Sequence, residues 1–315
     1  MEFKIINSAA LMVKFISAWE VAFQRTLDRS VYNWVFNAKN KVFGVIDDDT
    51  IVAGYCLMEF DAIYHDVQKK GLLCNNVFVN GYKYQKFGLF DKLTEYSINE
   101  AKKDKYDFAV GFPNEKAIKS HLRSGWNEGP IIHFYELDPN FIQDEHIDLS
   151  NKIIEWYSSK DAALQSKLPE ISNFYAINSH NYSYSSFRSN NFVAWRYLEN
   201  PRYSYDFCFV YDVSGKLTGV FICKYYPANK KVHLVDYIIN NNEHIKVSIK
   251  SIIKKYNNHE IDVIDCWVSK SDSEVFTCVG FKESERFTYC ISRGIESDFR
   301  IDLSSHIVLG DNDVY

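Results

Sequence analysis

Apolar and polar positions along the first half of the chain alternate between two periods, which predicts a mixture of helices and strands. An i, i+4 apolar stripe follows Ser8, a residue type that caps helices, and it consists of Leu11, Phe15, Trp19 and Phe23. Short apolar runs between turn residues predict strands at Phe3–Ile6, Val42–Ile46, Ile51–Phe60, Leu72–Val79, Asp107–Phe112 and Pro130–Leu137. Further helices are expected over Ser30–Asn37, from Leu89 through Leu93 to Tyr96, and from Asn114 to Gly125.

The second half repeats this order of elements. The helix that ends at Gly125-Trp126 has a counterpart that ends at Gly280-Phe281, and Trp195 precedes a hairpin-like stretch as Trp34 does. The expected elements are a helix over Phe192–Asn200, strands at Phe207–Tyr211, Leu217–Tyr225 and Val232–Ile239, a helix over Glu243–Tyr256, a strand at Ile261–Val268, a helix over Ser271–Val279 and a strand at Arg286–Ser292. Self-similarity at this period predicts a duplicated α+β unit, with a mixed sheet and flanking helices in each copy.

The length fits two domains better than one core. A chain of 315 residues is long for a single hydrophobic core. A polar stretch rich in Asp, Asn and Glu begins at Asp138 and predicts a linker. We therefore expect domains at 1–138 and 152–315, joined by residues 139–151.

Composition narrows the class of protein. The net charge of −5 and the lack of a basic stripe argue against nucleic-acid binding. Seven cysteines without a Cys-x-x-Cys pair suit a reducing compartment. The first residues are charged, and no run reaches the about 18 apolar residues of a membrane span. We expect a soluble cytoplasmic protein with no metal site, because no His, Cys or Asp cluster has ligand spacing. The oligomeric state stays open.

The most specific segment for chemistry joins a strand to a helix through Gln85-Lys86-Phe87-Gly88. Unpaired N–H groups at a helix N-terminus attract anions, and a glycine lets a phosphate approach the backbone. An ordinary connecting loop would also account for these residues. The second half has Asn240-Asn241-Asn242-Glu243 at this place, with no glycine and with an acidic residue.

The order of strand, Gln-x-x-Gly loop, helix, strand and Asn-led helix resembles the GNAT acyltransferase superfamily. The pyrophosphate motif of that family corresponds to Gln85 through Phe90, and its Asn-led helix motif corresponds to Asn114 through Trp126. The resemblance implies acetyl-CoA or another short acyl-CoA as the donor. Phe90 replaces the small residue that usually ends the first motif. His121 takes the place of the tyrosine that often protonates the leaving thiolate, and Phe276 occupies that place in the second half.

The resemblance also implies roles for individual residues. The acyl carbonyl is expected near the backbone of the strand end, and the cofactor-binding candidates are Val77, Phe78, Val79, Gln85, Lys86, Phe87, Gly88, Leu89, Phe90 and Asn114. We expect direct attack by an amine without a covalent acyl-enzyme, because no nucleophile elbow is present. His121 is a catalytic candidate because imidazole titrates near neutral pH, although it could instead pack on Trp126.

The second half supplies the remaining candidates. Asp236 lies in an apolar strand, where a carboxylate needs a partner or a task, and it is the second catalytic candidate. The substrate-binding candidates are His65, Trp195, Arg196, Tyr197, His233 and Tyr237. A core or solvent-facing position is the alternative for each. Without its own anion loop, the second domain is expected to contribute to the acceptor site.

Two segments indicate which class of acceptor substrate the protein uses. Trp195–Tyr205 and His306–Tyr315 resemble parts of tandem-domain GNAT proteins from bacterial surface-polysaccharide clusters, such as those for O-antigen and lipopolysaccharide biosynthesis. The resemblance implies an N-acyltransferase for a nucleotide-linked amino sugar, with a dTDP-linked amino-dideoxyhexose favoured. The alternatives are a small-amine or peptide acetyltransferase, a tRNA-dependent aminoacyltransferase, and a GNAT-like scaffold without activity.

Overall fold

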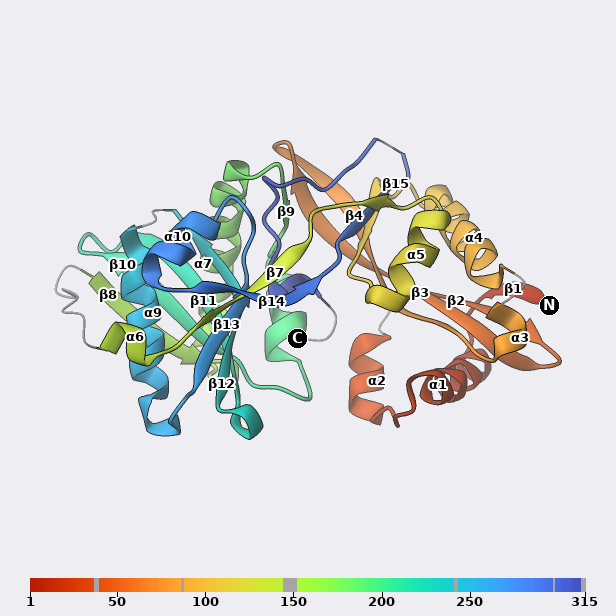
Figure 1. Cartoon of the computed structure of the whole chain (residues 1–315), viewed down its shortest axis with the longest axis horizontal. Coiled ribbons are helices and arrows are strands. Elements are labelled where there is room, and N and C mark those ends of the chain that lie inside the picture. Colours follow the sequence, from red (N-terminus) through yellow and green to blue (C-terminus); the bar gives the residue numbers. More distant parts are fainter. Residues whose placement is uncertain (37–39, 86–87, 144–151, 241–242, 297, 313–315) are drawn as a thin grey trace. The chain divides into compact units, whose positions relative to one another are not determined.

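The computed structural model describes residues 1–36, 40–85, 88–143, 152–240, 243–296 and 298–312. The chain forms two compact units, each with its own sheet (Figure 1). The first unit contains Met1–Ala62, Gln68–Pro130 and Thr288–Ile301, and the second contains Ile63–Val67, Ile131–Phe287 and Asp302–Tyr315. Neither unit is one contiguous stretch of chain. Within the described residues, no helix is long and apolar enough to cross a membrane.

The first unit is a mixed sheet with helices on both faces. Its strands follow the order β1-β2-β3-β4-β5-β15-β6. They are β1 (Glu2–Ile5), β2 (Asn40–Asp47), β3 (Thr50–Tyr64), β4 (Val67–Val79), β5 (Phe108–Gly111), β6 (Asn127–Glu128) and β15 (Ile291–Gly294). Its helices are α1 (Ala9–Phe23), α2 (Arg29–Val35), α3 (Tyr82–Gln85), α4 (Leu89–Lys103) and α5 (Glu115–Arg123).

Local sequence signals start and end the helices that matter for the site. The side chain of Ser8 accepts a hydrogen bond from the Leu11 amide and begins α1, as its position before an apolar stripe predicts. The side chain of Asn114 accepts from the Ala117 amide and begins α5. Gly125 follows α5 in a left-handed conformation, which ends the helix.

The second unit has a sheet of the same design. Its strands follow the order β14-β7-β13-β12-β11-β10-β8. They are β7 (Ile132–Leu137), β8 (Lys152–Ser158), β10 (Asp206–Asp212), β11 (Leu217–Tyr226), β12 (Lys231–Ile239), β13 (Val263–Trp267) and β14 (Lys282–Thr288). The short strand β9 (Tyr184–Ser186) is not part of this sheet, because it pairs with β3. The helices are α6 (Asn140–Gln143), α7 (Leu164–Asn178), α8 (Asn190–Val193), α9 (Glu243–Tyr256) and α10 (Ser273–Val279). Short turns are η1 (Ser179–Asn181), η2 (Ala194–Leu198, a π-helical turn), η3 (Pro227–Asn229), η4 (Asn257–His259) and η5 (Leu309–Asp311).

The two sheets have the same order of strands when the first is followed from β1 and the second from β8. The difference is that one strand is exchanged between the two halves of the chain. β15, from the second half of the chain, lies between β5 and β6, whereas β7, from the first half, lies between β13 and β14. Each sheet therefore has a strand from the other half of the chain at this place in its order. The two strands pair antiparallel in equivalent places, β7 with β13 and β15 with β5. The exchange explains why the units differ from the contiguous domains expected at 1–138 and 152–315.

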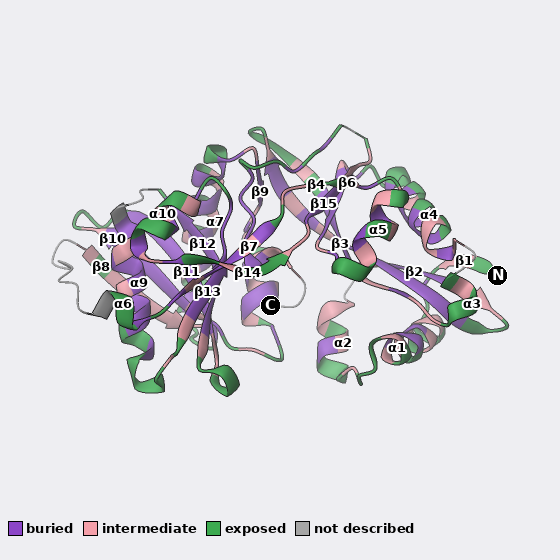
Figure 2. Cartoon of the chain, viewed as in Figure 1, coloured by how far each residue is buried: buried purple, intermediate pink, exposed green. Residues whose placement is uncertain are grey.

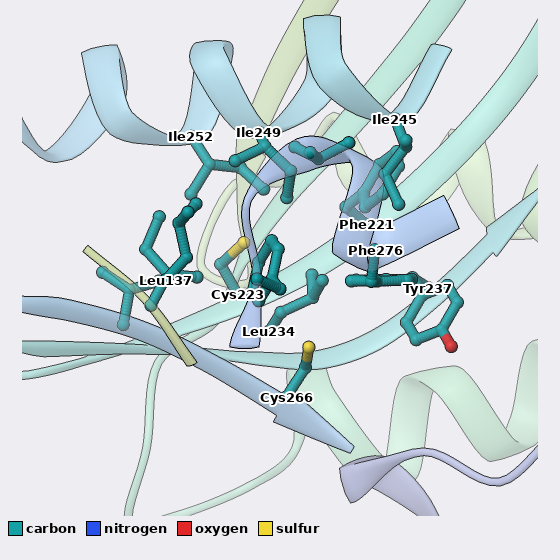
Figure 3. Close-up of a cluster of buried hydrophobic side chains, with 14 of the residues drawn as sticks. Leu137, Phe221, Cys223, Leu234, Tyr237, Ile245, Ile249, Ile252, Cys266 and Phe276 are labelled. Carbon is teal, nitrogen blue, oxygen red and sulfur yellow. The ribbon is translucent and has the colours of Figure 1, made fainter. Parts of the chain in front are cut away.

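Three buried clusters hold these sheets against their helices (Figure 2). In the first unit, one cluster joins the sheet to α4 and α5 through Leu89, Leu93 and Ile118, and another joins it to α1 through Phe15 and Trp19. In the second unit, α9 lays three isoleucines on the sheet, as Figure 3 shows, and they are Ile245, Ile249 and Ile252. This is the apolar stripe expected over 243–256.

The α+β class and the repeated order of elements are confirmed, but several local predictions needed correction. The single strand expected over Arg286–Ser292 is two strands, β14 and β15, which belong to different sheets. The helix expected over Phe192–Asn200 is α8 followed by a π-helical turn. The helix α7 was missed, because its apolar stripe is weak and Pro169 lies inside it.

Candidate functional site

The first unit opens at the place where β4 and β5 separate. These strands run parallel and pair from Gly71↔Phe108 to Cys74↔Gly111, where β5 ends. β4 continues to Val79, so this side of the strand faces no β5 residue beyond Cys74. Asn76 has a left-handed backbone (φ 49), which bends the strand at this point. Backbone groups that leave a ladder in this way can bind a ligand.

The strand end beyond Cys74 is accessible in part. Asn76, Val77 and Val79 are half-buried, whereas Phe78 is buried and packs on Phe15 with ring centroids 5.4 Å apart. Of the three residues expected to hold the acyl group, Val77 and Val79 therefore line the opening. Phe78 belongs to the core on the α1 face.

His121 reaches this opening from α5. Its Nε2 lies 3.8 Å from the Sγ of Cys74, the last paired residue of β4. The side chain is 4% exposed, with the rings of Phe90 and Trp126 edge-on to it at 4.9 and 5.6 Å. The structure thus places the imidazole at the point where the strands separate, and it also packs on Trp126.

The hydrogen bonds of His121 define its protonation. Nδ1 lies 3.0 Å from the carbonyl oxygen of Ala117, which can only accept, so Nδ1 carries a proton. Burial lowers the pKa of His121 and outweighs the opposing effect of that hydrogen bond. The neutral ring therefore presents a lone pair on Nε2 toward the Cys74 sulfur, which makes it a proton acceptor in the resting state.

Three further buried polar groups lie in the same part of the core. The Tyr55 hydroxyl, the Thr94 hydroxyl and the Trp126 indole N–H make no hydrogen bond of normal geometry within the described residues. Burial, and next the neighbouring Cys74, raise the pKa of Tyr55, while Thr94 opposes them. Cys74 and Thr94 are therefore close neighbours of the Tyr55 hydroxyl. Such groups are unusual in a protein core.

The expected phosphate loop is described in part. Gln85 ends α3 and is exposed, and Gly88 precedes α4 with a left-handed backbone (φ 60). Lys86 and Phe87 lie outside the described residues. Leu89 is buried in the core, and Phe90 turns onto His121 rather than staying small as in the family motif. Asn114 is exposed, and its side chain caps α5.

Charge at the start of α4 is compatible with an anion. Asp91 is the acidic residue of its first turn, and it accepts hydrogen bonds from Arg123 at 2.8 Å and from Ser124 at 2.7 Å. These partners lower the pKa of Asp91 and offset its charge. The helix N-terminus therefore keeps its attraction for a phosphate group.

The equivalent strand end of the second unit is closed. β12 pairs with β13 only from Lys231↔Val263 to His233↔Asp265 and then continues alone, so these strands also separate. However, β12 is buried from Val232 to Ile239. Gly310 of η5 fills the space: a Cβ on it would lie 2.3 Å from the Tyr197 hydroxyl and 2.9 Å from Asp236.

Asp236 belongs to the buried cluster beneath this segment. One of its oxygens accepts from Tyr175 at 2.5 Å, and the other accepts from Tyr197 at 2.5 Å and from Arg188 Nε at 2.6 Å. Arg188 Nη2 also pairs with Asp311 at 2.8 Å. Asp236 and Tyr197 are thus brought together, but in a fully buried, hydrogen-bonded setting without solvent access.

A second buried cluster surrounds Asp272, beside α10. Its carboxylate accepts from the hydroxyls of Tyr237 at 2.9 Å and Tyr182 at 3.2 Å. His306 places Nδ1 3.4 Å from Asp272 and Nε2 2.9 Å from the Tyr237 carbonyl. Burial acts to lower the pKa of His306, but the hydrogen bond and charge of Asp272, with the charges of Asp236 and Asp311, raise it overall.

The other substrate candidates are spread over three places. Arg196 and His233 lie near Lys224, a buried lysine of β11 whose ammonium lies 3.2 Å from the Tyr203 ring centroid and 4.5 Å from that of Tyr226. Burial, then Arg196 and Arg202, lower the pKa of Lys224 to about 7. His233 lies opposite Lys224 on β12, and its Nδ1 contacts Asp265. Trp195 is half-buried against Phe192. His65 is exposed at a turn, and its amide donates to Ser183.

Sequence reasoning missed Cys74, Tyr55 and Lys224. Lys224 carried a readable signal, since it is a cation inside the apolar run Leu217–Tyr225. Cys74 and Tyr55 carried none, because thiols and tyrosines are ordinary in strands. Among the described residues, no group of three or more His, Cys, Asp or Glu side chains could hold a metal ion.

Comparison with known proteins agrees with this geometry. Residues 7–128 match the model of the acetyltransferase (GNAT) domain. A probable N-acyltransferase of unknown function from Enterococcus faecalis V583 has a similar structure (TM-score 0.75, 12% identity, 94% of this chain and 73% of that chain). So does a GCN5-related N-acetyltransferase from Anabaena variabilis (0.73, 13%, 94% and 73%).

A tandem GNAT protein from the clavulanic acid biosynthesis pathway matches over its whole length (TM-score 0.60, 9% identity, 95% of this chain and 100% of that chain). No curated protein matches the chain in sequence. Residues 7–128 thus match a GNAT acetyltransferase domain, and the chain has the fold of tandem GNAT structures, with two GNAT-like sheets.

Proposed function

We propose that the protein transfers an acyl group from acyl-CoA to the amino group of a nucleotide-linked amino sugar, by direct attack of the amine. The observation that carries the acyl-transfer part is the open strand end of the first unit, where a neutral imidazole with a lone pair on Nε2 lies at the separation of β4 and β5. The second unit has Phe276 at the place of His121 and a filled strand end.

The residues of the first unit suit each demand of the reaction. Acyl-CoA supplies the activated thioester. Backbone N–H groups beyond Cys74 can polarise its carbonyl, as preorganised donors do at developing oxyanions. His121 Nε2 takes up the proton that the attacking amine loses and returns it to the departing sulfur. The order of these transfers follows from the tautomer, because a neutral ring protonated on Nδ1 must accept at Nε2 before it can donate.

The start of α4 suits the pyrophosphate of the donor. Gly88 places no side chain over the first amides of α4, and Arg123 offsets the charge of Asp91. Asn114 is proposed to support this site indirectly, because its side chain fixes the first turn of α5 and therefore the position of His121.

Support for the acceptor comes from the second unit and is independent of the donor site. The segment from Trp195 to Tyr205 resembles tandem GNAT proteins that acylate nucleotide-linked sugars, and it contributes Arg196 and Tyr203 to the surroundings of Lys224. Clustered cations beside aromatic rings suit a diphosphate and a flat base. We favour a dTDP-linked amino-dideoxyhexose as the acceptor.

The test compares acceptors at fixed acetyl-CoA, with release of free CoA thiol as the readout. The panel contains a dTDP-linked amino-dideoxyhexose, the same amino sugar without the nucleotide, a UDP-linked amino sugar, spermidine, and a peptide with a free N-terminus. We expect turnover of the nucleotide-linked amines and much weaker turnover of the free sugar. Equal rates with the free sugar, or activity only with spermidine or the peptide, would contradict the proposed acceptor.

A second measurement separates an inactive scaffold from an enzyme with another acceptor. A ligand that binds the native state raises its melting temperature, so coenzyme A should raise Tm in a concentration-dependent way. If Tm does not change, the donor site itself is refuted.

A further inference from the structure

We propose that Cys74 is a second acyl acceptor in the first unit, which takes the acyl group from acyl-CoA as a protein thioester when no amine is bound. The inference rests on the proposed function for its donor, and it concerns a residue that direct transfer to an amine does not require.

The first observation is the pairing of a thiol with an oriented base. Cys74 Sγ lies 3.8 Å from His121 Nε2, and the Ala117 carbonyl keeps the ring proton on Nδ1. The lone pair of Nε2 therefore faces the thiol. A cysteine is nucleophilic as its thiolate, and an adjacent imidazole that can take the proton is the usual means of activation.

The second observation is the unsatisfied hydroxyl beside the thiol. Tyr55 is fully buried, its hydroxyl has no hydrogen bond of normal geometry within the described residues, and Cys74 is a close neighbour. A thioester on Cys74 would bring a carbonyl oxygen next to this donor. The Tyr55 hydroxyl could then pair with that oxygen, which would remove the cost of a buried polar group left alone.

The position of Cys74 makes it a competitor of the amine. It is the last residue of β4 that pairs with β5, and the proposed acyl position begins with the next residues of the same strand. The thiol and an incoming amine would therefore use the same Nε2 lone pair. When no amine is bound, Cys74 is the nucleophile that can attack the acyl group.

The step balances without any further reagent. The Cys74 sulfur attacks the thioester carbonyl while His121 Nε2 takes the thiol proton. The bond between the carbonyl carbon and the coenzyme sulfur breaks, a bond to Cys74 Sγ forms, and the proton passes from Nε2 to the departing thiolate. The products are S-acyl Cys74 and free CoA, and reversal by CoA is equally possible because both species are thioesters.

Four other cysteines lie in different surroundings within the described residues. Burial raises the pKa of Cys208, Cys223 and Cys266, which keeps them protonated in the core. In the second copy, Leu234 and Phe276 occupy the places of Cys74 and His121. Cys56 is buried in the neighbouring strand β3, on the α1 face of the sheet, and is a matched control.

The experiment incubates the full chain with acetyl-CoA and no amine, and then measures intact mass and maps the modified peptide. We expect the mass of one acetyl group on Cys74, removable by neutral hydroxylamine and by excess CoA. Cys56→Ala should keep the adduct, whereas Cys74→Ala and His121→Phe should lose it. Cys74→Ala should retain at least half of the wild-type turnover of the amine. Pre-incubation with acetyl-CoA should delay the first turnover in wild type but not in Cys74→Ala.

The controls separate this inference from the proposed function. If coenzyme A raises Tm and the amine is acylated, but wild type gains no acetyl group on Cys74, the inference fails while the function stands. An adduct that resists hydroxylamine, or one that persists in Cys74→Ala, also refutes it. If neither binding nor transfer occurs, the proposed function fails first.

Discussion

The two strand ends, β4 in the first unit and β12 in the second, are the same structural element used in opposite ways. In both units the parallel partner stops early, so backbone beyond Cys74 and beyond His233 has no neighbour on that side. In the first unit this backbone is half-exposed and faces an imidazole. In the second, η5 and a buried ion cluster around Asp236 occupy the space.

The comparison shows that the separation of two parallel strands is a feature of the fold and not by itself a site. The backbone geometry is shared, so the difference lies in a few residues and in what fills the gap. In the first unit, His121 contacts Cys74 at the point where the strands separate. Arg188, Asp236 and Asp311 make the second gap part of the core, and their mutual pairing offsets the cost of burying charge.

The largest effect on kcat is expected when His121 is replaced by phenylalanine, the residue that the second unit has at the equivalent position (Phe276). His121→Phe should lower kcat by about 10²–10⁴-fold, the usual range for loss of a general acid–base group. Because burial lowers the pKa of His121, wild-type kcat should fall only as pH drops below about 6.5, and the variant should lack this acid limb. The KM for acyl-CoA should stay near wild type.

Controls make this result specific. Phe276→Leu, at the equivalent place of the second unit, should leave kcat unchanged, and His121→Tyr should recover part of the rate. If His121→Phe keeps most of its turnover and its pH–rate profile overlays that of wild type, His121 has only a packing role.

The second prediction concerns the buried ion cluster that fills the strand end of the second unit. Asp236→Ala leaves the buried Arg188 guanidinium with one carboxylate fewer and should reduce the free energy of unfolding by about 3–5 kcal/mol, measured by urea denaturation. Asp262→Ala, an exposed substitution in the same unit, should change it by less than about 0.5 kcal/mol. A folded Asp236→Asn variant with wild-type stability and greatly reduced kcat would instead favour the catalytic role.

The third prediction tests the donor loop with two glycines that share a left-handed backbone. Gly88 precedes α4, and Gly215 lies in a turn of the second unit with no atom near its Cβ position. Substitution by Val should strain either site by roughly 1–2 kcal/mol. Only Gly88→Val should raise the KM for acyl-CoA, by about tenfold, which corresponds to roughly 1.4 kcal/mol. Equal KM values for the two variants would exclude a phosphate site at Gly88.

The smallest expected effect is a pH dependence of the free energy of unfolding, which arises from His306 in the second unit. His306 has a raised pKa in the folded state, so its protonated form stabilises the protein fully below the unfolded value of about 6.5. This contribution is lost as pH rises through the folded pKa. Urea unfolding at several pH values from 6 upward (about 6, 7.5 and 9) should show a decline for wild type that His306→Gln lacks. Parallel curves for the two proteins would rule out this ion pair.

Much of the fold could be predicted because its signals are local. The stripe Ile245, Ile249, Ile252 and the caps at Ser8 and Asn114 depend on neighbours within a few residues. The placement of β7 and β15 could not be predicted, because a strand that is buried on its apolar face satisfies either sheet equally well. The same difference between local and long-range signals applies to the candidate site. The motif around Asn114 located His121, but its approach to Cys74 joins residues 47 positions apart.

The exchange of β7 and β15 has a consequence for how the enzyme comes into existence. Every residue assigned to the donor site lies before Trp126, yet the slot between β5 and β6 is filled only by Ile291–Gly294. During translation, the edges of β5 and β6 that pair with β15 therefore stay unpaired until nearly the whole chain has left the ribosome. The sheet of the first unit is completed last, and a nonsense codon between Trp126 and Ile291 would leave it without β15 while sparing every residue of the proposed donor site.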